Sequence, residues 1–226
     1  MNRESEPLCR RLAYTFRDPA LLTRALTHRS KGADHNERLE FLGDSVLNLV
    51  VSAELYDRFP GLTEGDLTRL RANLVRKPTL AAHARALDLG RYIELGGGEL
   101  KSGGYDRDSI LADALEALLG AVFKDGGLEQ AARVIHSLYR ENLAQLDPNA
   151  IPKDPKTQLQ EYLQKHSLPT PSYHIVEVIG EAHHQHFVVE CAVSALSAVV
   201  RGEGASRRVA EQQAAEKALA LLGPST

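Results

Sequence analysis

The sequence predicts an all-α domain followed by a small α+β domain with the element order α-β-β-β-α. Three observations lead to this prediction. Apolar residues recur with a helical period through residues 8–146. Residues 148–155 contain three prolines and little apolar content, which is typical of a semi-rigid linker. Residues 187–193 then alternate between two faces, as a strand does. We expect domains at residues 1–147 and 156–226, joined by a linker at 148–155.

Capping residues and helix breakers divide the first domain into helices. Asp18 precedes a proline and is a good N-cap. Asp34 and Glu37 have the spacing of a capping box ahead of a long apolar-periodic run. Gly90 is the expected C-terminal stop of another helix. The expected helices cover residues 18–27, 39–59, 63–75, 78–90, 108–124 and 128–143.

Glycines mark the irregular parts of the first domain. The glycine-rich residues 96–104 are expected to form a loop, and Gly126 and Gly127 to end a helix. A short extended piece is expected at 92–95. In the second domain, the alternation and the alanine-rich C-terminal segment predict helices and strands. These elements cover residues 155–166, 172–181, 187–193, 196–203 and 206–222, the first and last being helices.

The overall composition excludes several classes of protein. Of the 226 residues, 43% are hydrophobic and 25% charged, which is ordinary for a globular chain. The longest apolar runs are too short for a membrane span, and the polar N-terminus does not resemble a signal peptide. Cys9 and Cys191 are too few for a disulfide scaffold. We therefore expect a cytoplasmic protein that does not engage membranes. The net charge of −3 gives no support for a nucleic-acid partner, so local charge would have to provide any such binding.

Two groups of acidic residues indicate the chemistry. Glu37, Glu40 and Asp44 fall within an arc of roughly 60° on one helix face. Asp113 and Glu116 lie three residues apart in an almost wholly apolar helix, where unpaired acids are rare. For either group alone, an ordinary ion-pair network remains open as an explanation. Its candidate cations are Arg38, Arg69 and Arg71.

Taken together, the two groups favour a metal site. If the two helices pack, at least four carboxylates converge, and each pair at ~5 Å repels by roughly 3 kcal/mol at an effective dielectric of about 20. A divalent cation would offset this repulsion, and all-oxygen ligands suit Mg²⁺ or Mn²⁺. The mid-helix Gly43 suggests close approach by another helix or by a substrate. Magnesium sites of this kind handle phosphate esters.

Residues 35–45, His-Asn-Glu-Arg-Leu-Glu-Phe-Leu-Gly-Asp-Ser, resemble the defining motif of the ribonuclease III family. Residues 99–104 and 109–117 resemble the second acidic motif of this family, and the segment after the linker resembles a double-stranded-RNA-binding domain. The resemblance covers nearly the whole chain in the order of the minimal bacterial enzyme. It implies a Mg²⁺-dependent endonuclease that cuts both strands of duplex RNA, with Mn²⁺ able to substitute and no small-molecule cofactor. Products with 5′-phosphate and 3′-hydroxyl ends and short 3′ overhangs are implied, as is a role in processing ribosomal and messenger RNA precursors.

The resemblance also implies roles for individual residues. Glu40, Asp113 and Glu116 match the metal ligands, and Glu116 is also a catalytic residue. Asp44 matches the acid that positions the attacking water. The family acts as a homodimer, in which Phe41 matches an aromatic side chain that enters the partner subunit. Two further acids near the cleavage site are matched by Glu37 and Glu64.

Polar residues of the second domain are spaced for duplex-RNA recognition, which reads 2′-hydroxyls and phosphates across successive grooves. The first helix offers four polar residues on one face, and the strand connection at 180–185 supplies a loop. The last helix begins with two arginines, which oppose the helix dipole and are better explained by an anion in front of it. The expected RNA-binding residues are Thr157, Gln160, Glu161, Gln164, His183, Ser206, Arg207 and Arg208, of which His183 follows from the resemblance alone. The sequence departs from the family at Val209, where a lysine is common.

Other interpretations of these segments are weaker. His183, His184 and His186 with Cys191 match no recurring zinc spacing. The glycines at 96–98 fail as a P-loop because Leu100 replaces the required glycine. A non-catalytic RNA-binding protein is disfavoured by the retention of all the motif acids. A phosphohydrolase of small molecules would leave the second domain without a purpose.

Overall fold

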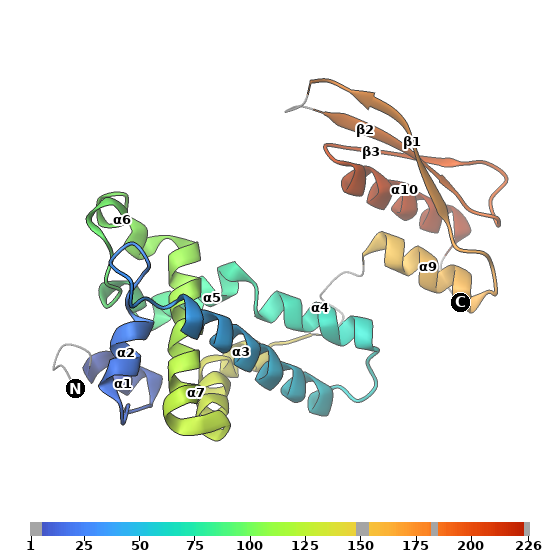
Figure 1. The fold of residues 1–226 in the computed structure, drawn as a ribbon. Coiled ribbons are helices and arrows are strands. Elements are labelled where there is room, and N and C mark those ends of the chain that lie inside the picture. Colours follow the sequence, from blue (N-terminus) through green and yellow to red (C-terminus); the bar gives the residue numbers. More distant parts are fainter. Residues whose placement is uncertain (1–5, 148–153, 182–184, 224–226) are drawn as a thin grey trace. The chain divides into compact units, whose positions relative to one another are not determined.

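The computed structural model describes residues 6–147, 154–181 and 185–223. The chain divides into two compact units, residues 1–151 and 152–226, and each is described by itself. The first is all-helical and the second is α-β-β-β-α, which confirms the predicted fold class (Figure 1). The expected linker lies largely outside the described residues. Among the described helices, none is long and apolar enough to cross a membrane.

Two long helices form the centre of the first unit. Helix α3 (Glu37–Arg58) packs against α7 (Asp108–Leu138), and fully buried leucines from both helices, such as Leu47 and Leu115, fill the space between them. The other elements surround this pair (Figure 1). They are α1 (Glu6–Leu12), α2 (Pro19–Ala25), α4 (Glu64–Leu74), α5 (Lys77–Ala86), η1 (Leu89–Arg91), α6 (Gly97–Lys101), η2 (Gly104–Asp106) and α8 (Arg140–Ala144).

Helices α3 and α7 touch through their backbones at two glycines. A Cβ atom on Gly43 would lie 1.7 Å from the carbonyl oxygen of Glu116, and one on Gly120 would lie 2.2 Å from that of Leu39. No side chain fits at either position without moving a helix. Of the two explanations expected for Gly43, the contact with another helix is the one that the structure shows.

Helix starts follow the predicted caps at some positions and not at others. Asp18 caps α2, and Thr63 forms a reciprocal capping box with Asp66 at α4. The capping box expected from Asp34 and Glu37 does not form. Asn36 occupies the N-cap position, but its side chain makes no capping hydrogen bond and donates instead to the Ala25 carbonyl oxygen at 3.4 Å. The Asp34 carboxylate accepts a hydrogen bond from Arg24 Nε at 2.6 Å. The Asp34 carboxylate, which its spacing from Glu37 predicted to cap the helix, therefore pairs with Arg24, ten residues earlier in the sequence.

Several expected boundaries also shift. Helix α5 ends at Ala86, before the stop expected at Gly90, and Asp88 adopts a left-handed conformation (φ 56°). Gly90 packs instead against the backbone, because a Cβ there would lie 2.2 Å from the Tyr105 carbonyl oxygen. The segment 96–104 is not a simple loop but contains α6 and the start of η2. Helix α7 starts at Asp108 with Arg107 in the N-cap position. Its range to Leu138 spans two helical stretches that meet at Gly127, whose non-helical backbone (φ 80°, ψ −179°) interrupts the helix where Gly126 and Gly127 were expected to end it.

The extended piece expected at 92–95 is reduced to an isolated parallel bridge between Thr27 and Glu94. This bridge joins the segment after α2 to the segment before α6.

The second unit packs two helices on one face of an antiparallel sheet (Figure 1). Its elements are α9 (Pro155–Lys165), β1 (Ser172–Ile179), β2 (His186–Ala192), β3 (Val200–Gly204) and α10 (Arg207–Leu222). The predicted alternation of β2 is confirmed on its inner face, where Val189 and Cys191 are fully buried with Leu159 and Leu163 of α9. The buried residues of α10 are four alanines and Glu211, whereas Leu221 near the end of the helix is exposed.

Candidate active site and RNA-binding surface

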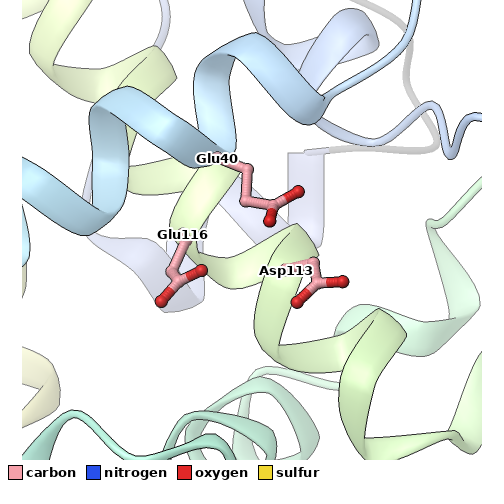
Figure 2. A group of neighbouring side chains, drawn as sticks. All are labelled: Glu40, Asp113 and Glu116. Carbon is pink, nitrogen blue, oxygen red and sulfur yellow. The ribbon is translucent and has the colours of Figure 1, made fainter.

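Three carboxylates converge where α3 and α7 cross. Glu40 comes from α3, and Asp113 and Glu116 come from successive turns of α7 (Figure 2). One carboxylate oxygen from each lies within 4.8 Å of the others, and all three residues are half-buried. The structure thus brings together the three residues predicted as metal ligands.

The backbone contact between the helices explains this convergence. Gly43 rests against the carbonyl of Glu116, and Gly120 rests against that of Leu39, so residues 39–43 of α3 run antiparallel beside residues 116–120 of α7. Glu40 and Glu116 belong to these two contacting turns, and Asp113 lies three residues before Glu116 on α7. Residues three apart share a helix face, so the acids of both helices meet on one side of the crossing.

The electrostatics of the cluster disfavour three full negative charges. Burial, together with the negative charges of Asp44, Glu40 and Asp113, raises the pKa of Glu116 to about 8. The pKa values of Glu40 and Asp113 are also raised, in both cases mainly by burial. A bound cation would remove this penalty. The donors are all carboxylate oxygens, a ligand set that suits Mg²⁺ or Mn²⁺ better than zinc.

The other predicted acids occupy different places. Asp44 is exposed, accepts a hydrogen bond from Asn48 Nδ2 at 2.8 Å, and is close enough to raise the pKa of Glu116. Glu37 faces the cluster from its rim and forms an ion pair with Arg29 at 3.1 Å. Glu64 lies outside the three-carboxylate cluster at the start of α4, where it accepts a hydrogen bond from Thr68 at 2.8 Å.

A cavity of about 350 Å³ opens beside the cluster, and it contains residues that the sequence did not reveal. Its walls combine Glu40 and Asp113 with groups from the segments after α2 and before α7. Lys77, at the start of α5, lowers the pKa of all three clustered acids. No local pattern could identify these groups, because they come from four separate segments. The titratable cavity residues not predicted as site residues are His28, Arg29, Glu99 and Arg107.

The arginines considered as partners for the acids have other neighbours. Arg69 forms an ion pair with Asp66. Arg71 Nη1 donates a hydrogen bond to Ser52 Oγ at 3.0 Å. Arg38 lines a different pocket on the other side of α3. The positive charge beside Asp113 comes instead from Lys77, His28 and Arg29, in that order of influence on its pKa.

The burial and contacts of His28 set its ionisation. Burial lowers its pKa, an effect that Glu99, Asp113 and Glu37 oppose. The ring is held by Ser30, whose hydroxyl lies 2.8 Å from Nδ1.

An apolar side chain stands out on the surface of α3. Phe41 is 77% exposed and borders a pocket of about 810 Å³, whose apolar lining includes Leu21, Leu39 and Leu42. Leu49 and Tyr56 are exposed farther along the same helix. A large exposed aromatic beside an apolar pocket is typical of a protein interface.

The predicted polar face of α9 is available on the surface. Thr157, Gln160, Glu161 and Gln164 are all exposed, whereas Leu159 and Leu163 between them are fully buried. His183, predicted to enter a minor groove, lies outside the described residues.

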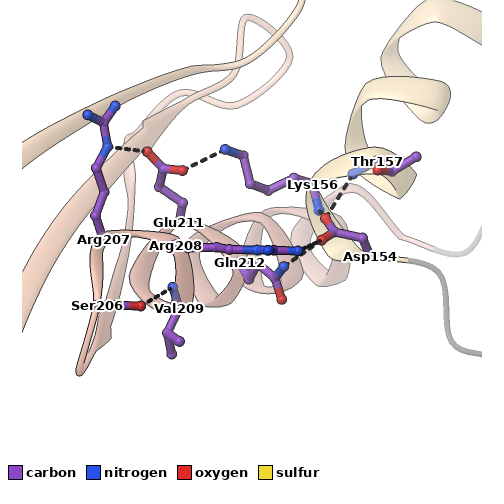
Figure 3. A network of polar contacts seen from close by, with 9 residues as sticks. All are labelled: Asp154, Lys156, Thr157, Ser206, Arg207, Arg208, Val209, Glu211 and Gln212. Carbon is purple, nitrogen blue, oxygen red and sulfur yellow. Dashed lines mark hydrogen bonds and ion pairs between the residues drawn. The ribbon is translucent and has the colours of Figure 1, made fainter. Parts of the chain in front are cut away.

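The first turn of α10 carries a network of charges (Figure 3). The Glu211 carboxylate accepts hydrogen bonds from Arg207 Nε at 2.8 Å and from Lys156 Nζ at 2.6 Å. Lys156 comes from α9 and was not predicted to take part. Ser206 caps the helix, accepting a hydrogen bond from the backbone N–H of Val209 at 3.3 Å.

Three residues of this turn are exposed to solvent. The side chain of Arg208 is 82% exposed, with its guanidinium 4.0 Å from Asp154. Val209 is 52% exposed, so it is not a core residue. Arg207 is held by Glu211 but retains an exposed guanidinium edge (Figure 3). A surface of exposed cations at a helix N-terminus is suited to phosphate.

The models of two protein families match the sequence of this chain. The description "Ribonuclease-III-like" matches residues 18–143, and "Double-stranded RNA binding motif" matches residues 155–222. The first contains the carboxylate cluster, and the second contains α9, the sheet and α10.

Individual proteins match over nearly the full length. "Ribonuclease 3" of Pasteurella multocida (strain Pm70) is 53% identical over 222 residues, which is 98% of this chain and 99% of that protein. "Ribonuclease 3" of Thiobacillus denitrificans is 59% identical over 211 residues, 93% of each. A crystal structure of the nuclease domain of ribonuclease III from Campylobacter jejuni covers 65% of this chain and all of that chain. It has a TM-score of 0.61 and 44% identity. A second structure of that domain, described for flexibility in a region involved in dimer formation, covers 61% of this chain and 97% of that chain. Its TM-score is 0.60 at 45% identity.

Proposed function

Because the chain belongs to the ribonuclease III family, we propose that this endoribonuclease cuts both strands of duplex RNA with the help of a divalent cation held by Glu40, Asp113 and Glu116. The observation that carries this proposal is the convergence of three half-buried carboxylates within 4.8 Å, with the pKa of Glu116 raised to about 8. Mg²⁺ is the proposed ion, and Mn²⁺ is expected to replace it. When bound, such an ion lowers the pKa of a water molecule and neutralises charge on phosphoryl oxygens.

The surrounding residues would prepare the reaction. Asp44, exposed and held by Asn48, would accept a hydrogen bond from the attacking water and orient it. Glu116 would act both as a ligand and as a catalytic residue, and Glu37 would hold Arg29 at the rim. Water attacks phosphorus and the bond from phosphorus to the 3′ oxygen breaks. The products then carry a 5′-phosphate and a 3′-hydroxyl, and staggered cuts leave short 3′ overhangs.

The second unit would grip the duplex by its shape. The exposed polar face of α9 suits contacts with 2′-hydroxyls in a minor groove, as would His183. The exposed Arg208 and the outer edge of Arg207 suit phosphates across the adjoining major groove. Glu64 is proposed to lie near the bound strand.

A homodimer would supply one cutting site for each strand. The exposed Phe41 and the apolar pocket beside it support this part of the proposal, since a second copy would bury both. Ribosomal and messenger RNA precursors in the cytoplasm are the proposed substrates, on the basis of the family resemblance.

Incubating the purified protein with a long, end-labelled RNA duplex tests the proposal. Cleavage should require Mg²⁺ or Mn²⁺, stop with EDTA, and yield fragments whose 5′ ends lose phosphate to a phosphatase. Sedimentation of the wild type and of Phe41→Ala at several concentrations tests the dimer. Binding of duplex RNA without cleavage under all these conditions would favour a non-catalytic RNA-binding protein instead.

A further inference from the structure

His28 lies in a tightly bonded turn after α2, beside the cavity at the acidic cluster. Its backbone N–H donates to the carbonyl oxygen of Glu94 at 3.0 Å, and its carbonyl accepts from the N–H of Lys31 at 2.9 Å. The bridge between Thr27 and Glu94 fixes the preceding residue. The position of the His28 ring is therefore set by the backbone on both sides.

The contacts of the ring determine which of its nitrogens carries a proton. The backbone N–H of Ser30 donates to His28 Nδ1 at 3.2 Å. The Ser30 hydroxyl lies 2.8 Å from the same nitrogen and itself accepts from the N–H of Gly96 at 2.9 Å, which leaves its proton free to point at the ring. A backbone N–H can only donate, so Nδ1 must present its lone pair. The proton of the imidazole is then on Nε2.

The Nε2–H group of His28 needs a hydrogen-bond acceptor in the cavity. Nδ1 faces Ser30, so the opposite edge of the ring, which carries the Nε2–H group, is the edge available to the cavity. Glu99 and Asp113, the carboxylates with the strongest influence on the His28 pKa, have other partners: Glu99 forms an ion pair with Arg107 at 3.0 Å, and Asp113 belongs to the proposed cation site. An oxygen of the bound RNA strand is an acceptor that would enter this space.

We propose that His28 is a substrate-binding residue of this site, donating a hydrogen bond from Nε2–H to a backbone oxygen of the RNA strand that is cut. The acceptor is either a non-bridging phosphate oxygen or a ribose 2′-hydroxyl near the scissile bond. This inference rests on the proposed function, because it requires RNA in the cavity.

Two substitutions separate this role from a structural one. In His28→Asn, the amide oxygen can occupy the position of Nδ1 and keep the contact with Ser30, but the distal donor is lost. In His28→Gln, the longer amide can place an N–H near the position of Nε2, while the contact with Ser30 is lost. Loss of one hydrogen bond to a charged or polar partner reduces kcat/KM on the order of 10- to 100-fold. We expect this loss for His28→Asn and a loss below about fivefold for His28→Gln.

Single-turnover cleavage of a short RNA duplex by the full-length protein measures these effects, with thermal melts of the same samples. His136, which pairs with Glu54 at 3.6 Å and lies outside this cavity, supplies matched Asn and Gln controls that should cleave like the wild type. The opposite order, with His28→Asn fully active and His28→Gln impaired, would show a structural role and overturn the inference. If both His28 variants lose activity, substituted RNA decides the matter.

Substituted RNA also identifies the acceptor. If a 2′-hydroxyl accepts the bond, a 2′-deoxy nucleotide beside the scissile bond should slow the wild type but not His28→Asn further. If a phosphate accepts it, a methylphosphonate at that position should show the same pattern instead. Equal effects of every substitution on the wild type and on His28→Asn would refute the contact. If the wild type cuts duplex RNA but shows these equal effects, only this inference is wrong. If the wild type cuts no duplex RNA, the proposed function is wrong, and this inference is wrong with it.

Discussion

Replacing Glu116 by glutamine should stabilise the cation-free protein while abolishing cleavage. In the fold the pKa of Glu116 is about 8, against an ordinary value of 4.5, because burial and the neighbouring acids disfavour its charged form. A raised carboxyl pKa means that the folded state binds the proton more tightly than the unfolded state. The resulting stability is fully present below pH 4.5 and is lost as the pH rises through 8.

The size of the effect follows from the same shift. Each pKa unit corresponds to about 1.4 kcal/mol, and partial solvent exposure of the side chain reduces the total. The neutral glutamine should therefore raise the free energy of unfolding at pH 8 by on the order of 2–3 kcal/mol relative to the wild type, and by much less at pH 5.

Denaturant unfolding in EDTA at a series of pH values measures this difference. Glu129→Gln is a suitable control, because Glu129 is 85% exposed and far from the cluster in sequence, and it should shift stability by less than ~0.5 kcal/mol. Single-turnover assays and filter binding on the same samples should show cleavage lost and duplex-RNA binding retained. A Glu116→Gln protein that is less stable than the wild type at pH 8 in EDTA, or that cuts RNA at ordinary Mg²⁺ concentrations, would refute the reasoning.

Three further predictions concern other parts of the chain. Gly43→Ala should destabilise the first unit by more than ~3 kcal/mol, because the new methyl group would overlap the Glu116 carbonyl. Denaturant unfolding measures this loss. Gly97→Ala is the control, because a Cβ atom at Gly97 would have no neighbour within 4 Å. Val209→Lys should leave the melting temperature unchanged and tighten duplex-RNA binding, steepening the log–log salt dependence by somewhat less than one unit. Binding isotherms at several salt concentrations test this, and an unchanged affinity would contradict it. Cleavage of the chain within residues 149–153 should release two folded pieces, the first still dimeric by sedimentation; an unfolded or monomeric first piece would contradict the proposal.

The sequence predicts the clustered acids well because they lie on two regular helices. Helical period alone places Glu37, Glu40 and Asp44 on one face of α3. In the structure they have different partners: Glu40 joins the acids of α7, Glu37 pairs with Arg29 at the rim, and Asp44 accepts a hydrogen bond from Asn48 while still raising the pKa of Glu116. Period fixes the face of a helix that a side chain occupies, but the neighbouring helix decides which of these side chains meet.

Features that depend on distant segments were harder to predict. His28 reaches the site from a turn and Lys77 from the first residue of α5, and neither segment has a distinctive local pattern, so only the tertiary fold reveals them. Asp34 does not cap the helix, because its carboxylate is engaged by the Arg24 guanidinium. In the second unit, the sequence predicts that Arg207 binds an anion. It does not predict that the Glu211 carboxylate, one turn later, pairs with the same arginine.

The two-glycine crossing of α3 and α7 has a consequence for redesigning this protein. At Gly43 and Gly120 one helix rests on the other through peptide groups, with no side chain between them to change in size. Swaps between similar apolar residues elsewhere in the core can adjust the packing without resetting this contact. An engineer who wants a different spacing between the carboxylates, for example to favour a larger ion, must therefore change these two glycines together with the backbone that they hold.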